Sequence, residues 1–203
     1  MQRKAIAALM ISLLLLSACG HGAGEAGEQT FEAFRDTLTG TLVTVTAQVR
    51  VQRGDTVTDY TLTCQELPDG YDLTVTAPEQ AAGVTAHLRD GASALAFDDI
   101  ILPAGDLNGA GLTPLTALPY VVQAIRSGYV DLTWTEDGLQ VVQLITDDHT
   151  AVRLYLDGTV PQCAELSVDD TLCLRCTMEN WNLEQGSMND ESQDPNLGRD
   201  QSQ

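Results

Sequence analysis

The chain has 203 residues, of which 43% are hydrophobic, so it can bury the core of one medium-sized domain. Its 29 acidic and 10 basic residues give a formal net charge of −19. This charge argues against nucleic-acid binding, because phosphate contacts need clustered cations, and it opposes binding flat on an anionic bilayer. The simpler interpretation of the acidity is a solvated, self-repelling surface, and the alternative is attraction to a basic partner.

The N-terminal residues have the layout of an export signal. Arg3 and Lys4 precede an apolar stretch, residues 5–16, which is shorter than the roughly 20 residues that span a bilayer. The sequence Leu-Ser-Ala-Cys then ends at Cys19 and resembles the lipobox of bacterial lipoproteins, whose cysteine is lipidated before cleavage. The alternative is an ordinary signal peptide that is cleaved after Ala18 and followed by an incidental cysteine.

The lipobox resemblance implies a signal peptide at residues 1–18 and a lipid on Cys19. The chain would then be anchored to the cell membrane on its extracytoplasmic face, because each buried lipid methylene contributes about 0.8 kcal/mol and two or three acyl chains hold firmly. The mature chain would carry eight arginines, no lysine and 29 acidic residues, a net charge of −21.

Composition divides the rest of the chain into three segments. Residues 19–30 contain Cys19 and a glycine-rich polar stretch, which predicts a flexible tether. Residues 31–184 alternate between apolar and polar positions and should form the folded domain. Residues 185–203 have almost no apolar side chains, which predicts a disordered acidic tail.

The folded domain is expected to open with a short helix. Thr30 can cap this helix and Gly40 can end it. Phe31, Phe34 and Leu38 fall on one helical face at spacings of three and four. Period-two alternation between turn sequences then predicts a series of strands. The predicted strands are residues 42–51, 57–65, 71–77, 84–89, 92–97, 129–135, 139–146, 150–156, 161–168 and 172–178.

Two segments interrupt this series of strands. Residues 98–111 are rich in glycine and aspartate and are predicted to be a loop, although residues 100–102 are apolar. A second helix is then expected, with Thr113 as its cap and Gly128 at its end. Pro119 lies inside this helix and is expected to kink or restart it.

The turns between consecutive strands are short, so the sheet should be antiparallel, with the helices packed on its apolar face. Several local features have a recognisable order. A phrase at residues 76–84 (TAPEQAAGV) follows the third strand, Leu-Thr-Pro-Leu at residues 112–115 starts the inner helix, and a hairpin at residues 161–183 ends the domain. This order resembles the LolA/LolB-like lipoprotein carrier superfamily, especially LolA-like lipoproteins of Gram-positive bacteria, including spore-germination lipoproteins.

The resemblance implies an α+β fold that is mainly antiparallel β, with a strongly curved half-barrel sheet and helices in its concave face. Such a fold can hold an apolar ligand, for example an acyl chain or lipoprotein-like cargo. Each candidate lining residue can equally be an ordinary core residue. The candidates are Leu62, Leu73, Val75, Phe97, Leu118, Val121, Val122, Ile125, Trp134, Leu144 and Leu154.

A second hypothesis is a non-enzymatic accessory lipoprotein that binds a protein partner in a cell-envelope or spore process. Catalysis is not expected, and neither is a cofactor, because the sequence has no nucleophile, zinc or phosphate-loop motif. His87 and His149 are expected at the surface. The acidic pairs 98–99 and 147–148 are expected to be solvated, since neither has the layout of a calcium loop.

Four cysteines follow Cys19, and in an exported chain they could pair in three ways. Cys173 and Cys176 have the spacing of a redox or zinc motif, but they fall in a predicted strand, where that spacing directs their side chains to opposite faces. Cys64 and Cys163 lie apart as single residues and supply no second ligand pair for zinc. Structural cysteines are therefore the preferred interpretation, and the sequence leaves any pairing open.

Overall fold

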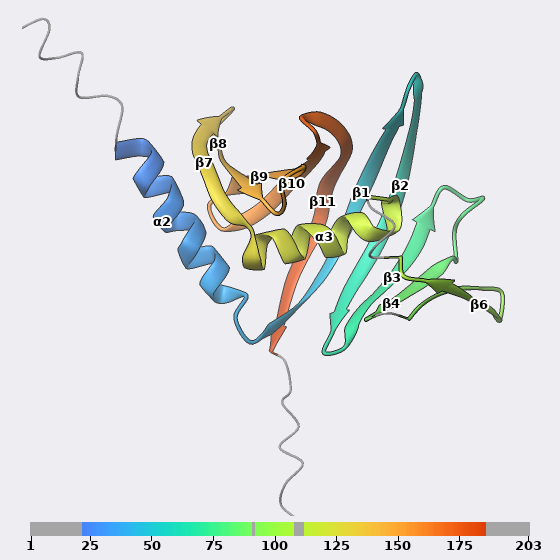
Figure 1. The fold of residues 1–203 in the computed structure, drawn as a ribbon. Helices are drawn as coiled ribbons and strands as arrows, with labels where there is room; N and C mark the ends of the chain where they lie inside the picture. Colours follow the sequence, from blue (N-terminus) through green and yellow to red (C-terminus); the bar gives the residue numbers. More distant parts are fainter. Residues whose placement is uncertain (1–21, 91, 108–111, 186–203) are drawn as a thin grey trace, which may run out of the picture.

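Residues 22–90, 92–107 and 112–185 are described in the computed structural model of the chain (Figure 1). The predicted signal peptide, the lipidation site Cys19 and residues 186–203 of the predicted tail lie outside the described residues. In the described part of the chain, no helix is both long and apolar enough to cross a membrane.

The strands form a single sheet in which every pair of neighbours is antiparallel. Their bounds are β1 Thr41–Arg53, β2 Thr56–Leu67, β3 Gly70–Ala77, β4 Thr85–Arg89, β5 Ser93–Phe97, β6 Ile100–Gly105, β7 Tyr129–Glu136, β8 Leu139–Ile145, β9 Thr150–Asp157, β10 Val160–Val168 and β11 Thr171–Gln185. The order across the sheet is β6-β5-β4-β3-β2-β1-β11-β10-β9-β8-β7. The first and last strands are therefore central neighbours, and β6 and β7 are the two edges.

The sheet is open and strongly curved, and two helices occupy its concave side (Figure 1). The helices are α2, Gly22–Thr37, and α3, Pro114–Ser127. Their apolar faces belong to the same buried cluster as the concave side of the sheet. The predicted fold class, an antiparallel half-barrel sheet with helices in its concave face, is confirmed.

The local sequence around α3 explains its bounds. The hydroxyl of Thr113 accepts a hydrogen bond from the N–H of Thr116, and the hydroxyl of Thr116 accepts one from the N–H of Thr113. Pro114 occupies the first turn, where its missing N–H costs nothing. Gly128 follows the last turn as predicted, and the helix continues through Pro119.

The start of α2 differs from the sequence prediction. The helix begins at Gly22 rather than at Thr30, so residues 22–30 of the predicted tether are helical. Thr30 donates its hydroxyl hydrogen to the carbonyl of Ala26 instead of capping the helix. Contacts with the sheet supply the reason, because Gln140 of β8 donates to the carbonyl of Gly27 and tertiary packing overrides the low helix propensity of glycine.

Two strands also differ from the prediction. Residues 98–111 are not simply a loop, because β6 occupies Ile100–Gly105 and pairs with β5. Asp98 and Asp99 both have positive φ, 48° and 65°, which makes the two-residue turn of this hairpin without the usual asparagine–glycine pair. β11 continues to Gln185 instead of ending at residue 178, since its second half remains paired with β1.

Candidate ligand-binding site

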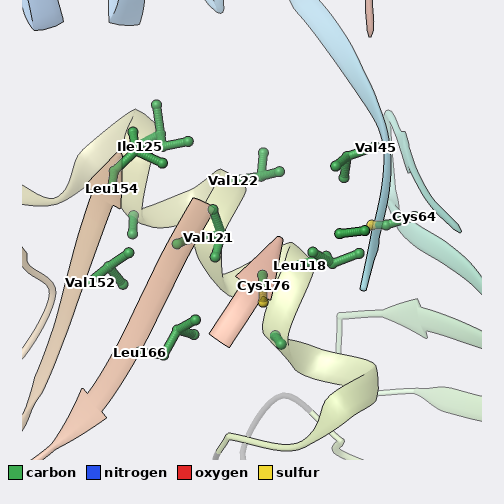
Figure 2. Close-up of a cluster of buried hydrophobic side chains, with 14 of the residues drawn as sticks. Val45, Cys64, Leu118, Val121, Val122, Ile125, Val152, Leu154, Leu166 and Cys176 are labelled. Carbon is green, nitrogen blue, oxygen red and sulfur yellow. The ribbon is translucent and has the colours of Figure 1, made fainter. Parts of the chain in front are cut away.

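The concave face of the sheet is filled by α3 at its centre. Figure 2 shows Leu118, Val121 and Ile125 of α3 directed into the cluster formed by the sheet. Nine of the eleven predicted lining residues are buried members of this core. These nine are Leu62, Leu73, Val75, Leu118, Val121, Val122, Ile125, Leu144 and Leu154. The structure therefore brings them together as packed core rather than as the walls of an open cavity.

Trp134 lies on the opposite face of the sheet from α3. It pairs with Val141, which points away from the core because its neighbour Val142 points into it. A bulge in β7 between Val130 and Leu132 shifts the alternation by one residue and turns Trp134 outward. The indole N–H donates to Glu136 on the same outer face, 3.1 Å away. The prediction that Trp134 lies inside the half barrel is corrected accordingly.

Phe97 lies in an open apolar groove at the β6 edge of the sheet. The groove has a volume of about 360 Å³. It is lined by Gln80, Val84, Leu95, Ala96, Phe97, Ile100 and Leu102. Three of these side chains are unusually exposed for large apolar groups: Phe97 by 53%, Ile100 by 60% and Leu102 by 59%. We call this surface the β5–β6 groove.

The β5–β6 groove lies on the concave face of the sheet. Ala86 of β4 belongs to the buried core and pairs with Leu95, and Leu95 pairs with Leu102. Residues that are directly opposite in a sheet share a face, so these side chains continue the core outward past α3. Ile101 alternates onto the other face, where it is 67% exposed. The sequence signal for the groove was the apolar run at residues 100–102 after two aspartates.

A second hollow, of about 640 Å³, lies along the face of α3 that carries Thr116, Tyr120 and Gln123. It is lined by Tyr71, Asp90, Leu112, Thr116, Pro119, Tyr120, Gln123, Arg126, Asp147, Thr150 and Val168. Both arms of the half barrel contribute to it, together with α3 between them. Tyr120 bonds to Thr146 and donates to Asp147 at 3.1 Å, and burial raises the pKa of its phenol. Several charged and polar side chains line this hollow, whereas Gln80 is the one polar residue in the described lining of the β5–β6 groove.

Two arginines fix the C-terminal ends of both helices. Arg126 of α3 donates to the carbonyls of Leu38 and Thr41 and to the carboxylate of Glu66, at 2.7 Å from the last. Arg35 of α2 donates to the carbonyls of Ile125 and Gly128, 2.7 and 2.6 Å away. Arg35 of α2 therefore binds carbonyls at the C-terminal end of α3, and Arg126 of α3 binds carbonyls just after the C-terminal end of α2. These contacts hold α3 in the concave face at this end.

The two histidines of the folded domain each face a carboxylate. His87 lies 2.8 Å from Asp72 on neighbouring strands, and exposed His149 lies 2.8 Å from Asp169. The carboxylate of Asp147 accepts the backbone N–H of His149, which holds the pKa of that carboxyl below its ordinary value. These pairs organise turns and strand surfaces, and no group of three or more metal-ligating side chains occurs among the residues that the structure describes.

All four cysteines of the described domain are unpaired. Cys64 and Cys176 are buried in the core, and burial raises the pKa of both thiols. Cys163 is buried on the outer face, beside Tyr155 of β9. Cys173 is half-buried and is the extra residue of a bulge where β11 meets β10. The cysteines thus pack as small apolar side chains, without the exposure of a redox pair.

Comparisons with known proteins give similarities in structure alone. No protein-family model matches the chain, and no curated protein sequence does. An uncharacterised conserved protein of Thermus thermophilus is 9% identical, with 76% of this chain and 86% of that chain covered and a TM-score of 0.45. A LolA superfamily protein of Nitrosomonas europaea is 10% identical, with 76% and 92% covered and a TM-score of 0.44. The lipoprotein LppX of Mycobacterium tuberculosis is 14% identical, with 77% and 93% covered and a TM-score of 0.38.

Proposed function

We propose that the chain is a lipoprotein, anchored by Cys19 on the extracytoplasmic face of the cell membrane, that holds an apolar ligand such as an acyl chain on its concave face. The observation that carries this proposal is the β5–β6 groove. Its exposed apolar side chains form one patch that continues the buried core. Contiguous exposed apolar patches of this kind usually mark a ligand-binding groove or an interaction site.

The chemistry of the groove favours hydrocarbon over a polar ligand. Among the residues that the structure describes, no charged side chain lines it, and Gln80 is its one polar member. A hydrocarbon chain needs no directional partner, and each methylene that leaves water contributes about 0.8 kcal/mol. Asp98 and Asp99 at the tip of the hairpin repel an anionic bilayer surface. The groove is therefore suited to a single chain that has left its membrane rather than to insertion into the bilayer.

The nine buried candidate residues have a supporting role in this proposal. Five of them lie on the sheet and form the floor against which α3 packs, and the other four belong to α3 and face that floor. They would touch a ligand only if α3 moved out of the concave face. Among the eleven candidates, Phe97 belongs to the groove itself. Leu95 and Leu102 join it there from the neighbouring strand positions.

A matched pair of substitutions on β6 tests the proposal. Leu102→Asp places a charge in the groove, and Ile101→Asp places the same charge on the opposite face of the same strand, at a similarly exposed position. Binding of a fluorescent fatty acid, dansyl-undecanoic acid, to the full chain should weaken at least tenfold for Leu102→Asp and less than twofold for Ile101→Asp. Equal binding by the two variants, or no binding by the wild type, would refute the groove as the ligand site.

The membrane anchor has a separate test. Cells that express the chain are labelled with radioactive palmitate and fractionated. We expect label in the chain and its recovery in the membrane fraction, and we expect both to be lost in Cys19→Ala. Label that persists in Cys19→Ala, or a wild-type chain without label, would contradict lipidation at Cys19 and leave the groove unaffected.

A further inference from the structure

Part of one edge of β11 has no paired strand in the described part of the chain. β10 pairs with β11 only as far as Cys163 opposite Thr177, whereas β1 pairs with β11 to its end at Gln185. Among the residues that the structure describes, residues 178–185 therefore have β1 on one side and no paired strand on the other. Figure 1 shows this part of β11 extending beyond β10. We call it the free edge of β11.

The register shows which backbone groups the free edge presents. The N–H of Val43 on β1 points away from β11, because it donates to the carboxylate of Glu66 at 2.9 Å. Val43 pairs with Leu183, so the N–H and C=O of Leu183 also point away from their partner strand. By alternation, Trp181 and Gln185 present their N–H and C=O groups outward as well. The free edge thus presents outward-facing N–H and C=O groups at three alternate residues.

Several other strand edges among the described residues are protected. The N–H of Val43 and the carbonyl of Thr41, where β1 runs past β2, are bound by Glu66 and Arg126 side chains. On β6, Pro103 lacks an N–H and Ala104 is a bulge residue, and both features hinder pairing with another strand. β7 is flanked by α2. A shorter unpaired stretch occurs at residues 56–60 of β2, near the tip of a hairpin.

Side chains beside the free edge indicate what would bind there. Leu183 is exposed on the concave side, whereas the ring of Trp181 packs against Phe34 of α2 and its buried indole N–H is not accessible to a partner. Glu179 and Glu184 are exposed along the same stretch. An added strand would therefore meet the apolar side chain of Leu183 on one face, with the carboxylates of Glu179 and Glu184 along the same stretch.

We propose that the free edge of β11 binds an extended segment of a protein partner by strand addition, and that this segment alternates apolar residues with lysine or arginine. Backbone hydrogen bonds supply the affinity and the alternating side chains supply the selectivity. A second copy of this chain is a poor occupant, because each copy carries a formal net charge of −19 and brings the same carboxylates. This site is separate from the β5–β6 groove and does not depend on ligand binding there.

The test uses the full chain and a fluorescein-labelled heptapeptide, Val-Lys-Val-Lys-Val-Lys-Val. Leu183→Pro removes an outward N–H without removing a hydrogen bond to β1, and Leu183→Ala removes only the side chain. Val57→Pro is the matched control, since Val57 presents its N–H outward on the shorter free stretch of β2. We expect Leu183→Pro to weaken binding at least tenfold, Leu183→Ala by threefold or less, and Val57→Pro to have no effect.

Amide hydrogen exchange gives a second measurement that does not need a variant. In the free chain, the amides of Trp181, Leu183 and Gln185 should exchange faster than those of Asn180 and Asn182, and the peptide should slow the first three. A peptide in which glutamate replaces lysine should bind at least tenfold more weakly. The proposal is overturned if the lysine peptide does not bind, if Leu183→Pro binds it like the wild type, or if the chain alone pairs through β11 as a dimer.

Discussion

Replacement of Glu66 tests how α3 is held in the half barrel. Its carboxylate accepts hydrogen bonds from Arg126 at 2.7 Å and from the N–H of Val43 at 2.9 Å, and its side chain is largely buried. A hydrogen bond to a charged group contributes about 1.5–3 kcal/mol. After Glu66→Ala, Arg126 keeps its hydrogen bonds to two carbonyls and some contact with water. The substitution should therefore lower the free energy of unfolding by about 3 kcal/mol, less than the sum of the two upper values.

Urea unfolding at pH 7 measures this cost. With a slope of about 2 kcal/mol per molar urea, Glu66→Ala should lower the midpoint by about 1.5 M without changing the slope. Glu66→Gln keeps an acceptor and should lose about half as much. Asp59→Ala, which removes the exposed ion pair with Arg50, serves as the control and should leave the midpoint unchanged. Equal midpoints for Glu66→Ala and Asp59→Ala would refute this account of how α3 is held.

Three further predictions concern strain, pH and thiol access. Gly70→Ala should destabilise the chain by at least about 2 kcal/mol in thermal unfolding, because φ is +147° and the new Cβ would lie 2.0 Å from the carbonyl oxygen of Leu88. Burial opposes ionisation of Asp72, but hydrogen bonds from histidine and arginine side chains outweigh it and lower its pKa. The resulting stability is present above the ordinary pKa of about 4 and is lost as pH falls through the lowered value, so Asp72→Asn should lose less stability than the wild type between pH 5 and pH 2 in urea titrations. Iodoacetamide should label Cys173 in the native chain and Cys64 only on unfolding, as read by mass spectrometry.

The sequence predicted most strands and the inner helix because their signals are local. Period-two alternation marks a strand with one buried face, as in β1, and the threonine cap, N-terminal proline and terminal glycine mark α3. β6 was missed because its sequence has three consecutive apolar residues, Ile100–Leu102, in place of period-two alternation, and they are followed by Pro103 and Gly105. The early start of α2 depends on contacts between Gly27 and the sheet, and no local sequence pattern indicates such contacts.

The candidate site was harder to predict than the fold for two physical reasons. Alternation identifies apolar positions, but whether they line a cavity depends on how far α3 enters the half barrel, and Leu118 and Ile125 fill it. A single bulge then moves a side chain to the other face, as Trp134 shows. Phe97 was the candidate that the structure places in an open groove, next to residues 100 and 102 of the strand that the sequence did not reveal.

Paramagnetic broadening by a spin-labelled fatty acid tests the central claim most directly. Doxyl-stearate is added to the isotope-labelled full chain, and the broadening of each backbone amide is measured by NMR. The account predicts the strongest broadening at the amides of Leu95, Phe97 and Leu102, with the amides of Val121 in α3 and of Cys176 on the sheet beneath it unaffected. Strongest broadening beneath α3, or broadening spread evenly over the surface, would contradict a ligand site in the β5–β6 groove.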